Sequence, residues 1–266
     1  MGPIAYELIG SLLAIGGITV GYVAYVFLIG VPQPGSFVGH SIGILGFLMM
    51  LSTETLYSLR KHWPNFNYGR MSIWLQAHVF TGLVGPYLVL LHSGWKFNGL
   101  AGVLTLMTGL VVLSGLIGRY IYTAAPRNLE GAEVAVFELE EKIEMADRKL
   151  KEQGFDQLGD AVLAAATDHP GQGWWLVVAR PFVRWRQRRR LRDEIAKLDP
   201  RRRAKAAKLE TIVAERQRLQ MEIDSLDVTR RLLAMWHLIH IPLSAALFAV
   251  AFIHVFGAMY YATFLR

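Results

Sequence analysis

The chain has 266 residues, of which 53% are hydrophobic and 18% are charged, and its formal net charge is +7. A mean hydropathy of +0.32 is too high for an ordinary soluble domain and supplies apolar material for several membrane spans. Cysteine is absent, which excludes disulfides, thiolate-held zinc, cysteine-ligated iron–sulfur clusters and covalent CxxCH attachment of haem.

Five stretches reach the roughly 20 mostly apolar residues that a spanning helix needs. Four lie in the first half of the chain and one closes it: Leu8–Gly30, Ser36–Leu59, Ser72–Ser93, Gly99–Tyr122 and Leu233–Leu265. We expect the first span to be retained and not cleaved as a signal peptide. No Lys or Arg precedes it, it carries no small-residue cleavage site, and its apolar run is too long.

Charge is concentrated between the fourth and fifth spans. Residues 124–232 hold 22 of the 28 Lys and Arg and 19 of the 21 Asp and Glu. The sequence therefore predicts an all-α protein with four spanning helices in 1–123, a charged helical insert in 124–232 and a fifth spanning helix in 233–266. Basic residues in the second loop and in the insert place the N-terminus and the insert in the cytoplasm, and the C-terminus outside.

Two spans each hold a pair of histidines 14 residues apart, His78 and His92 in the third and His240 and His254 in the fifth. Fourteen residues rise about 21 Å and fall about 40° short of four helical turns, so each helix presents two imidazoles on one face. Both spans run in the same direction. His78 can therefore face His240, and His92 can face His254, with one haem iron between each two rings.

Other interpretations of these histidines remain open at this point. A lone histidine in a membrane helix is more often a packed or interfacial residue, and metal transport through an imidazole relay is a further alternative. Zinc is disfavoured, because imidazoles about 21 Å apart on one helix cannot share an ion. His237 could replace His240 as a ligand, but the residue 14 positions after it is Ala251.

Small residues follow the first histidine of each pair on the same helix face. They would give a porphyrin room to approach the backbone, although ordinary helix packing also favours small residues. These positions are Gly82, Gly85, Ser244 and Ala251.

Three further polar residues lie at the depths of the two expected haems. Glu54, the only acid deep in a span, follows His40 by 14 residues, and the two could exchange protons with a quinone. The competing interpretation is that Glu54 extends to the inner interface and that His40 caps its helix. Arg119, at the end of the fourth span, could bind a haem propionate or anchor the helix at the interface.

The insert combines helical repeats with a basic aromatic run. Residues 129–152 and 209–233 each repeat apolar side chains at steps of three and four. This pattern predicts an antiparallel coiled-coil hairpin that offers a docking surface to a partner protein, and its second helix could continue into the fifth span. Between them, the run from Trp174 to Arg190 favours contact with an anionic membrane surface over nucleic-acid binding.

With a near-14-residue histidine pair on each of two helices, the sequence resembles the bis-histidine di-haem cytochromes of membranes. These include cytochrome b of bc-type quinol complexes and the transmembrane domain of ferric reductases and NADPH oxidases, to which the placement on spans three and five is most similar. The resemblance covers about 36–122 and 233–265. It implies that the axial ligands of two non-covalent haems b are His78, His92, His240 and His254.

The sequence also departs from that family pattern. The large insert is foreign to it, and neither a sixth span nor a flavin or nicotinamide domain follows the last helix, which favours a subunit role. We therefore expect a cytochrome b subunit of an oxidoreductase complex in a bacterial inner membrane. It would exchange electrons between the quinone pool and a cytochrome c, an iron–sulfur protein or a flavoprotein.

The main alternative is a protein without redox chemistry. It would be a histidine-lined metal or proton transporter, or a membrane scaffold whose coiled coil recruits partners.

Overall fold

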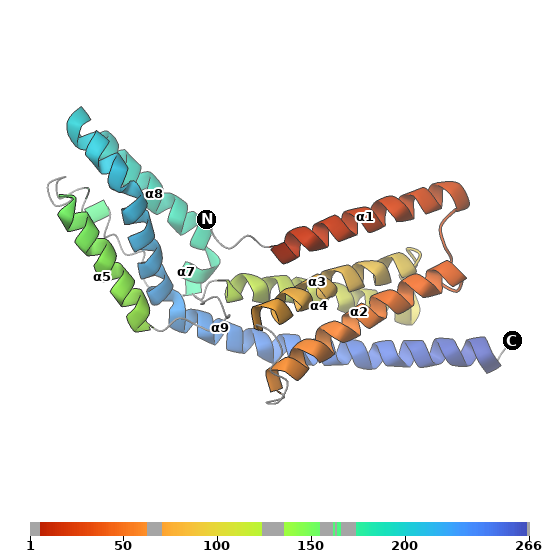
Figure 1. The fold of residues 1–266 in the computed structure, drawn as a ribbon. Coiled ribbons are helices and arrows are strands. Elements are labelled where there is room, and N and C mark those ends of the chain that lie inside the picture. The colour runs from red at the N-terminus through yellow and green to blue at the C-terminus, as the bar shows by residue number, and fades with distance from the viewer. Residues whose placement is uncertain are drawn as a thin grey trace. The chain divides into compact units, whose positions relative to one another are not determined.

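The computed structural model describes residues 6–62, 71–123, 136–154, 162, 164–165 and 174–264. Within these ranges every regular element is an α-helix (Figure 1), so the all-α prediction is confirmed there. In chain order the helices are α1 (Tyr6–Ile29), α2 (Phe37–His62), α3 (Met71–His92), α4 (Gly99–Tyr122), α5 (Val136–Glu152), α7 (Trp174–Val178), α8 (Arg180–Ala196) and α9 (Pro200–Phe264).

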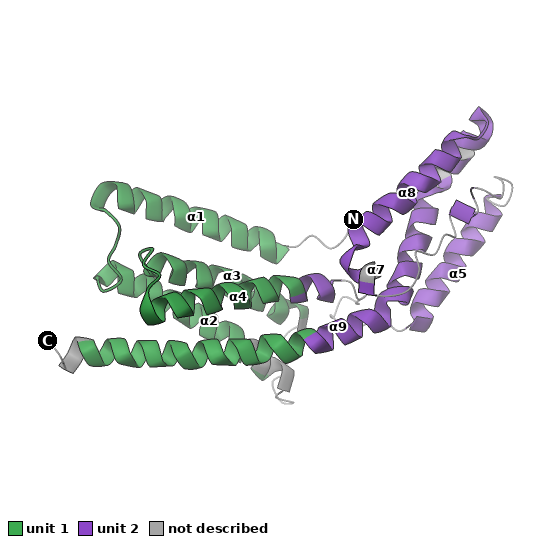
Figure 2. Ribbon diagram, turned by 180° about the vertical axis from the view of Figure 1, so that it is seen from behind, with its two compact units in different colours: residues 1–117, 129–131, 236–266 green, residues 118–128, 132–235 purple. Residues whose placement is uncertain are grey.

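The chain divides into two compact units (Figure 2). Unit 1 comprises residues 1–117, 129–131 and 236–266, and unit 2 comprises residues 118–128 and 132–235. The divisions fall inside α4 and α9, a few residues from the predicted limits of the insert. Each of these two helices therefore contributes to both units.

Among the described residues, five helices are long and apolar enough to cross a membrane. They are α1 to α4 and the apolar part of α9. Many of their large apolar side chains point outward: Leu13 is 72% exposed, Phe27 89% and Leu238 77%. Water would disfavour such a surface, whereas lipid chains cover it without penalty.

Two glycines let α2 and α3 cross with their backbones in contact. A Cβ atom built on Gly46 would lie 2.9 Å from the carbonyl oxygen of Gly85, and one on Gly85 would lie 3.0 Å from the carbonyl oxygen of Gly46. Further along, the hydroxyls of Thr53 and Thr81 are 2.6 Å apart. The two helices are therefore an antiparallel pair that tolerates no side chain at the crossing.

The core of unit 1 forms where four helices meet. Met50 from α2, Leu104 from α4 and Leu247 from α9 are buried together, and Val89 of α3 packs against them. The first helix joins through α3, where the hydroxyls of Thr19 and Tyr87 are 2.6 Å apart. This arrangement surrounds the histidine-bearing faces of α3 and α9 with α2 and α4.

The last helix, α9, is one element of 65 residues. Its beginning follows the rule that proline suits the first helical position, since Pro200 needs no hydrogen-bond partner for a backbone N–H there. A second proline, Pro242, lies inside the helix, a position that membrane helices tolerate. The predicted continuation of the insert's second helix into the fifth span is confirmed.

Unit 2 contains three antiparallel helices where the sequence predicted two. Leu139 and Leu150 of α5 are buried against α9, and Asp147 accepts a 2.6 Å hydrogen bond from Arg216. In addition, α8 buries a face against the same helix, as Val183 packs on Met221. The two-helix hairpin is therefore incomplete, because the arginines of α8 conceal a four-residue apolar repeat that makes it the third member.

The α2–α3 crossing can be tested with Gly46→Leu. The new side chain has no space beside Gly85, so we expect a loss of about 1–3 kcal/mol of unfolding free energy from overpacking. Gly17→Leu is the matched control, because a Cβ atom there has nothing within 4 Å. Unfolding of the detergent-solubilised protein, followed by circular dichroism, measures both. Equal stability of the two variants would contradict the crossing.

Candidate functional site

Four half-buried histidines of unit 1 form two facing pairs. His78 of α3 and His240 of α9 lie close enough to interact electrostatically, and so do His92 of α3 and His254 of α9. The structure thus brings together the same two pairs that the 14-residue spacing predicts. Each pair draws its imidazoles from two different helices.

Both histidines of α3 are oriented by backbone carbonyls of α2. Nδ1 of His78 lies 2.9 Å from the carbonyl oxygen of Thr53, and Nδ1 of His92 lies 2.8 Å from that of Gly39. A carbonyl oxygen only accepts, so Nδ1 must donate its proton in both contacts. Nε2 is then the bare nitrogen of each neutral ring, which is the tautomer that can ligate a metal.

A third glycine of α2, Gly43, makes room for the ring of His92. A Cβ atom on Gly43 would lie 2.7 Å from both Cγ and Nδ1 of that imidazole. Such distances are far below van der Waals contact, so even alanine would displace the ring. The position of His92 therefore depends on a glycine as well as on the carbonyl of Gly39.

On the other side, α4 and α9 hold His240. Its Nδ1 lies 3.1 Å from the hydroxyl of Ser114, and Trp236 donates from Nε1 to the Ser114 carbonyl at 2.8 Å. The Trp236 ring stacks on the His240 imidazole with centroids 4.6 Å apart. Neither Ser114 nor Trp236 was predicted from the sequence. The one available signal was the four-residue spacing between Trp236 and His240.

An apolar layer separates the two levels of histidines. Leu247 lies seven residues after His240 and seven before His254, and it is buried with Met50 and Leu104. Within this cluster and the side chains packed on it, every described member is apolar. The layer offers no hydrogen-bonding group to a water molecule, an ion or a proton.

The quinone candidates on α2 have different surroundings. His40 is exposed, its Nδ1 lies 3.3 Å from the carbonyl of Ser36, and its ring centroid is 6.4 Å from that of His92. The helix-terminal interpretation therefore describes His40. Glu54 is half-buried and directly follows Thr53, the residue that anchors His78.

Small residues after the histidines serve helix packing. A Cβ atom on Gly82 would meet the methyl group of Thr53 at 3.4 Å, and Gly85 lies against Gly46. The space beside both glycines is thus taken by α2, and the expectation that they make room for a porphyrin is corrected. Ser244 is buried and donates to the carbonyl of His240 at 2.9 Å.

Arg119 lies half-buried in the last turn of α4. This part of α4 belongs to unit 2. The assignment of Arg119 to a haem propionate stays a prediction.

The residues of each level fit a bis-histidine haem. In the described part of the chain, no three His, Asp or Glu side chains converge as ligands of a free metal ion. A haem iron takes only two protein ligands in this mode, since the porphyrin supplies the other four. Two imidazoles from different helices, of which three have a partner at Nδ1, meet that requirement.

The chain matches no protein-family model, and no curated protein or solved structure is significantly similar to it.

Nitrogen-15 NMR of histidine-labelled protein in bilayers tests the anchoring on α2. We expect His78 and His92 to carry their proton on Nδ1, because each faces a carbonyl oxygen that cannot donate. His78→Gln and His92→Gln assign the two signals by their disappearance. A proton on Nε2 of both rings would contradict the described contacts.

Proposed function

We propose that this chain is a membrane cytochrome b that transfers electrons across the bilayer, with one haem b held by His78 and His240 and a second by His92 and His254. The observation that supports it most is the pair of hydrogen bonds from Nδ1 of His78 and His92 to carbonyls of α2. When bound, each haem would supply a reversible one-electron couple without an open coordination position.

The protein's own groups prepare the ligands. Carbonyls of Thr53 and Gly39 fix the tautomer of the α3 imidazoles and raise the basicity of Nε2. On α9, the hydroxyl of Ser114 and the stacked ring of Trp236 restrict the rotation of the His240 imidazole. Rings held in this way lose little rotational freedom when they ligate iron, which strengthens binding.

The proposal includes a setting and partners. The chain would act as a subunit in a bacterial inner membrane, with the charged insert in the cytoplasm, and would pass electrons between quinone and a cytochrome c, iron–sulfur or flavoprotein partner. The described carboxyl at the level of His78 is that of Glu54, which could take up the proton that quinone reduction requires. Arg119 could pair with a propionate.

Transport of protons or metal ions along the histidines is the less suitable alternative. A relay needs polar groups at every step, whereas Met50, Leu104 and Leu247 separate the two levels. A scaffold function requires no ordering of imidazoles at all. The anchored Nδ1 atoms therefore favour redox chemistry over both alternatives.

A reduced-minus-oxidised visible spectrum of the purified protein tests the proposal. We expect b-type bands from two non-covalent haems per chain, and one haem per chain after His92→Ala, because the His78 level keeps both of its ligands. Absence of Soret absorption from protein produced with sufficient haem would refute the cytochrome assignment. Loss of both haems on this single substitution would refute independent pairs.

Gly43→Ala provides a test that leaves all four ligands in place. The added methyl group would overlap the His92 ring, so we expect the outer haem to be lost or its bands to shift, while the inner haem is unchanged. Gly109→Ala is the matched control, since a Cβ atom there has nothing within 4 Å. Haem content and band positions measure both variants, and identical spectra would argue against the described position of His92.

A further inference from the structure

Unit 2 carries an exposed aromatic stripe that its own packing does not use. Along α7 and α8 the stripe recurs at steps of four, four and three residues, and each member is at least half exposed. Its members are Trp174, Val178, Phe182 and Trp185, with the rings of the last two 5.8 Å apart. Contiguous exposed aromatic side chains of this kind mark an interaction surface.

The stripe lies opposite the buried face of α8. Val183 and Leu191 pack on α9, and at about 100° per residue Phe182 and Trp185 point to the other side of the helix. Since α8 already has its core contacts, the exposed aromatics add nothing to the folding of unit 2. They are available to an external partner.

Positive charge surrounds this stripe. The α8 helix contains seven arginines against two acidic residues, and the guanidinium of Arg189 lies 5.3 Å from the centroid of the Trp185 ring. On the side towards α9, burial, reinforced by repulsion from Arg180, lowers the pKa of Arg184. A partner that covers the stripe is therefore expected to carry negative charge.

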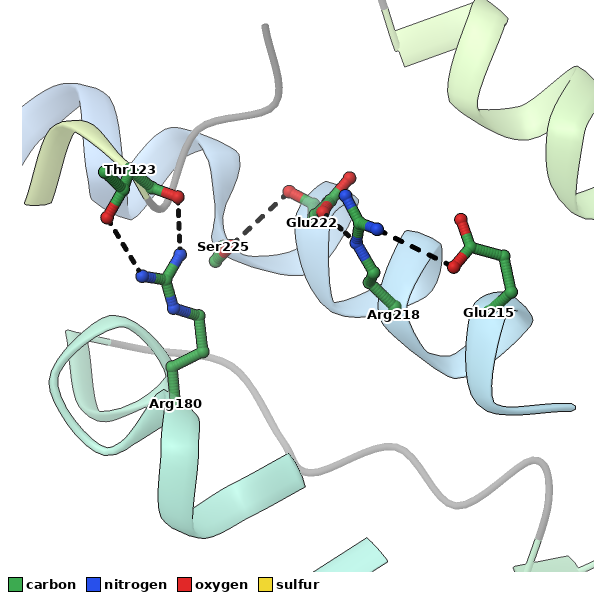
Figure 3. A network of polar contacts seen from close by, with 6 residues as sticks. All are labelled: Thr123, Arg180, Glu215, Arg218, Glu222 and Ser225. Carbon is green, nitrogen blue, oxygen red and sulfur yellow. Dashed lines mark hydrogen bonds and ion pairs between the residues drawn. The ribbon is translucent and has the colours of Figure 1, made fainter. Parts of the chain in front are cut away.

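Hydrogen bonds tie the stripe to the end of an apolar span (Figure 3). Arg180 donates to the carbonyl of Thr123 at 2.7 Å and to its hydroxyl at 3.2 Å, and Tyr120 donates to the carbonyl of Val178 at 2.9 Å. Both acceptor and donor on α4 are at the point where that helix ends its apolar run. Headgroups lie at this depth, where aromatic side chains are enriched.

We propose that the aromatic stripe and the neighbouring Arg186 and Arg189 bind the headgroup region of a bilayer that contains anionic phospholipid. The aromatic rings insert at the boundary between headgroups and acyl chains, while the guanidinium groups contact lipid phosphates. A protein partner also could cover aromatic and basic residues. The link to the end of α4 favours lipid, because it keeps the stripe beside the membrane surface.

Single cysteines can test the proposal without background labelling, since the chain has none of its own. Val178→Cys and Phe182→Cys, each carrying a nitroxide label, are compared with Met145→Cys on the exposed side of α5, in nanodiscs with and without phosphatidylglycerol. We expect labels at 178 and 182 to be more accessible to oxygen than to a water-soluble nickel complex when phosphatidylglycerol is present. The label at 145 should show the reverse.

The charge requirement has its own comparison. Arg186→Gln with Arg189→Gln should abolish the effect of phosphatidylglycerol on both labels, whereas Arg148→Gln on α5 should leave it unchanged. Helix content by circular dichroism verifies that the variants fold. Labels at 178 and 182 as accessible to nickel as the label at 145 would overturn the proposal. So would labels shielded from both reagents, the signature of a protein partner or a second copy of the chain.

Discussion

The backbone contact between α2 and α3 at Gly46 and Gly85 is the constraint on which the histidine geometry depends. Only when the helices approach this closely can carbonyls on α2 reach imidazoles on α3, on both sides of the crossing. A single close contact thus controls two anchors. The helix that carries no ligand of its own consequently determines how both ligands of its neighbour are presented.

The spacing along α2 reflects this role. Its anchoring carbonyls belong to Gly39 and Thr53, which are 14 residues apart, as are His78 and His92 on α3. Two antiparallel helices in contact keep the same rise per residue, so matched ligands need matched anchors. His40 and Glu54, whose own 14-residue spacing drew notice in the sequence, are the residues directly after these two anchors.

The sequence predicts the apolar helices and the pairing of the histidines well, because both depend on helical periodicity alone. Each described helix of unit 1 begins and ends within a few residues of the predicted limits. The anchors were missed for a physical reason: a backbone carbonyl has no signature in the sequence, and Gly43 is one of many glycines in apolar helices. Gly85 was misassigned because the sequence does not say which neighbouring helix a face meets.

In unit 2, periodicity was present but obscured. Val183, Gln187, Leu191 and Ile195 recur every four residues and are all buried, yet the arginines between them made the segment resemble a purely superficial one. Its opposite face carries a second apolar pattern. Two overlapping patterns in one helix defeat any interpretation that assumes a single buried side.

The partners of the imidazoles differ in one respect that makes the two levels chemically unequal. Thr53 and Gly39 offer carbonyl oxygens, which accept and never donate, so the protons of His78 and His92 are fixed. Ser114 offers His240 a hydroxyl, which can accept from Nδ1 or, after rotating about its C–O bond, donate to it. Among the anchored imidazoles, that of His240 alone can exchange tautomers without losing its hydrogen bond, which makes its level the adjustable one.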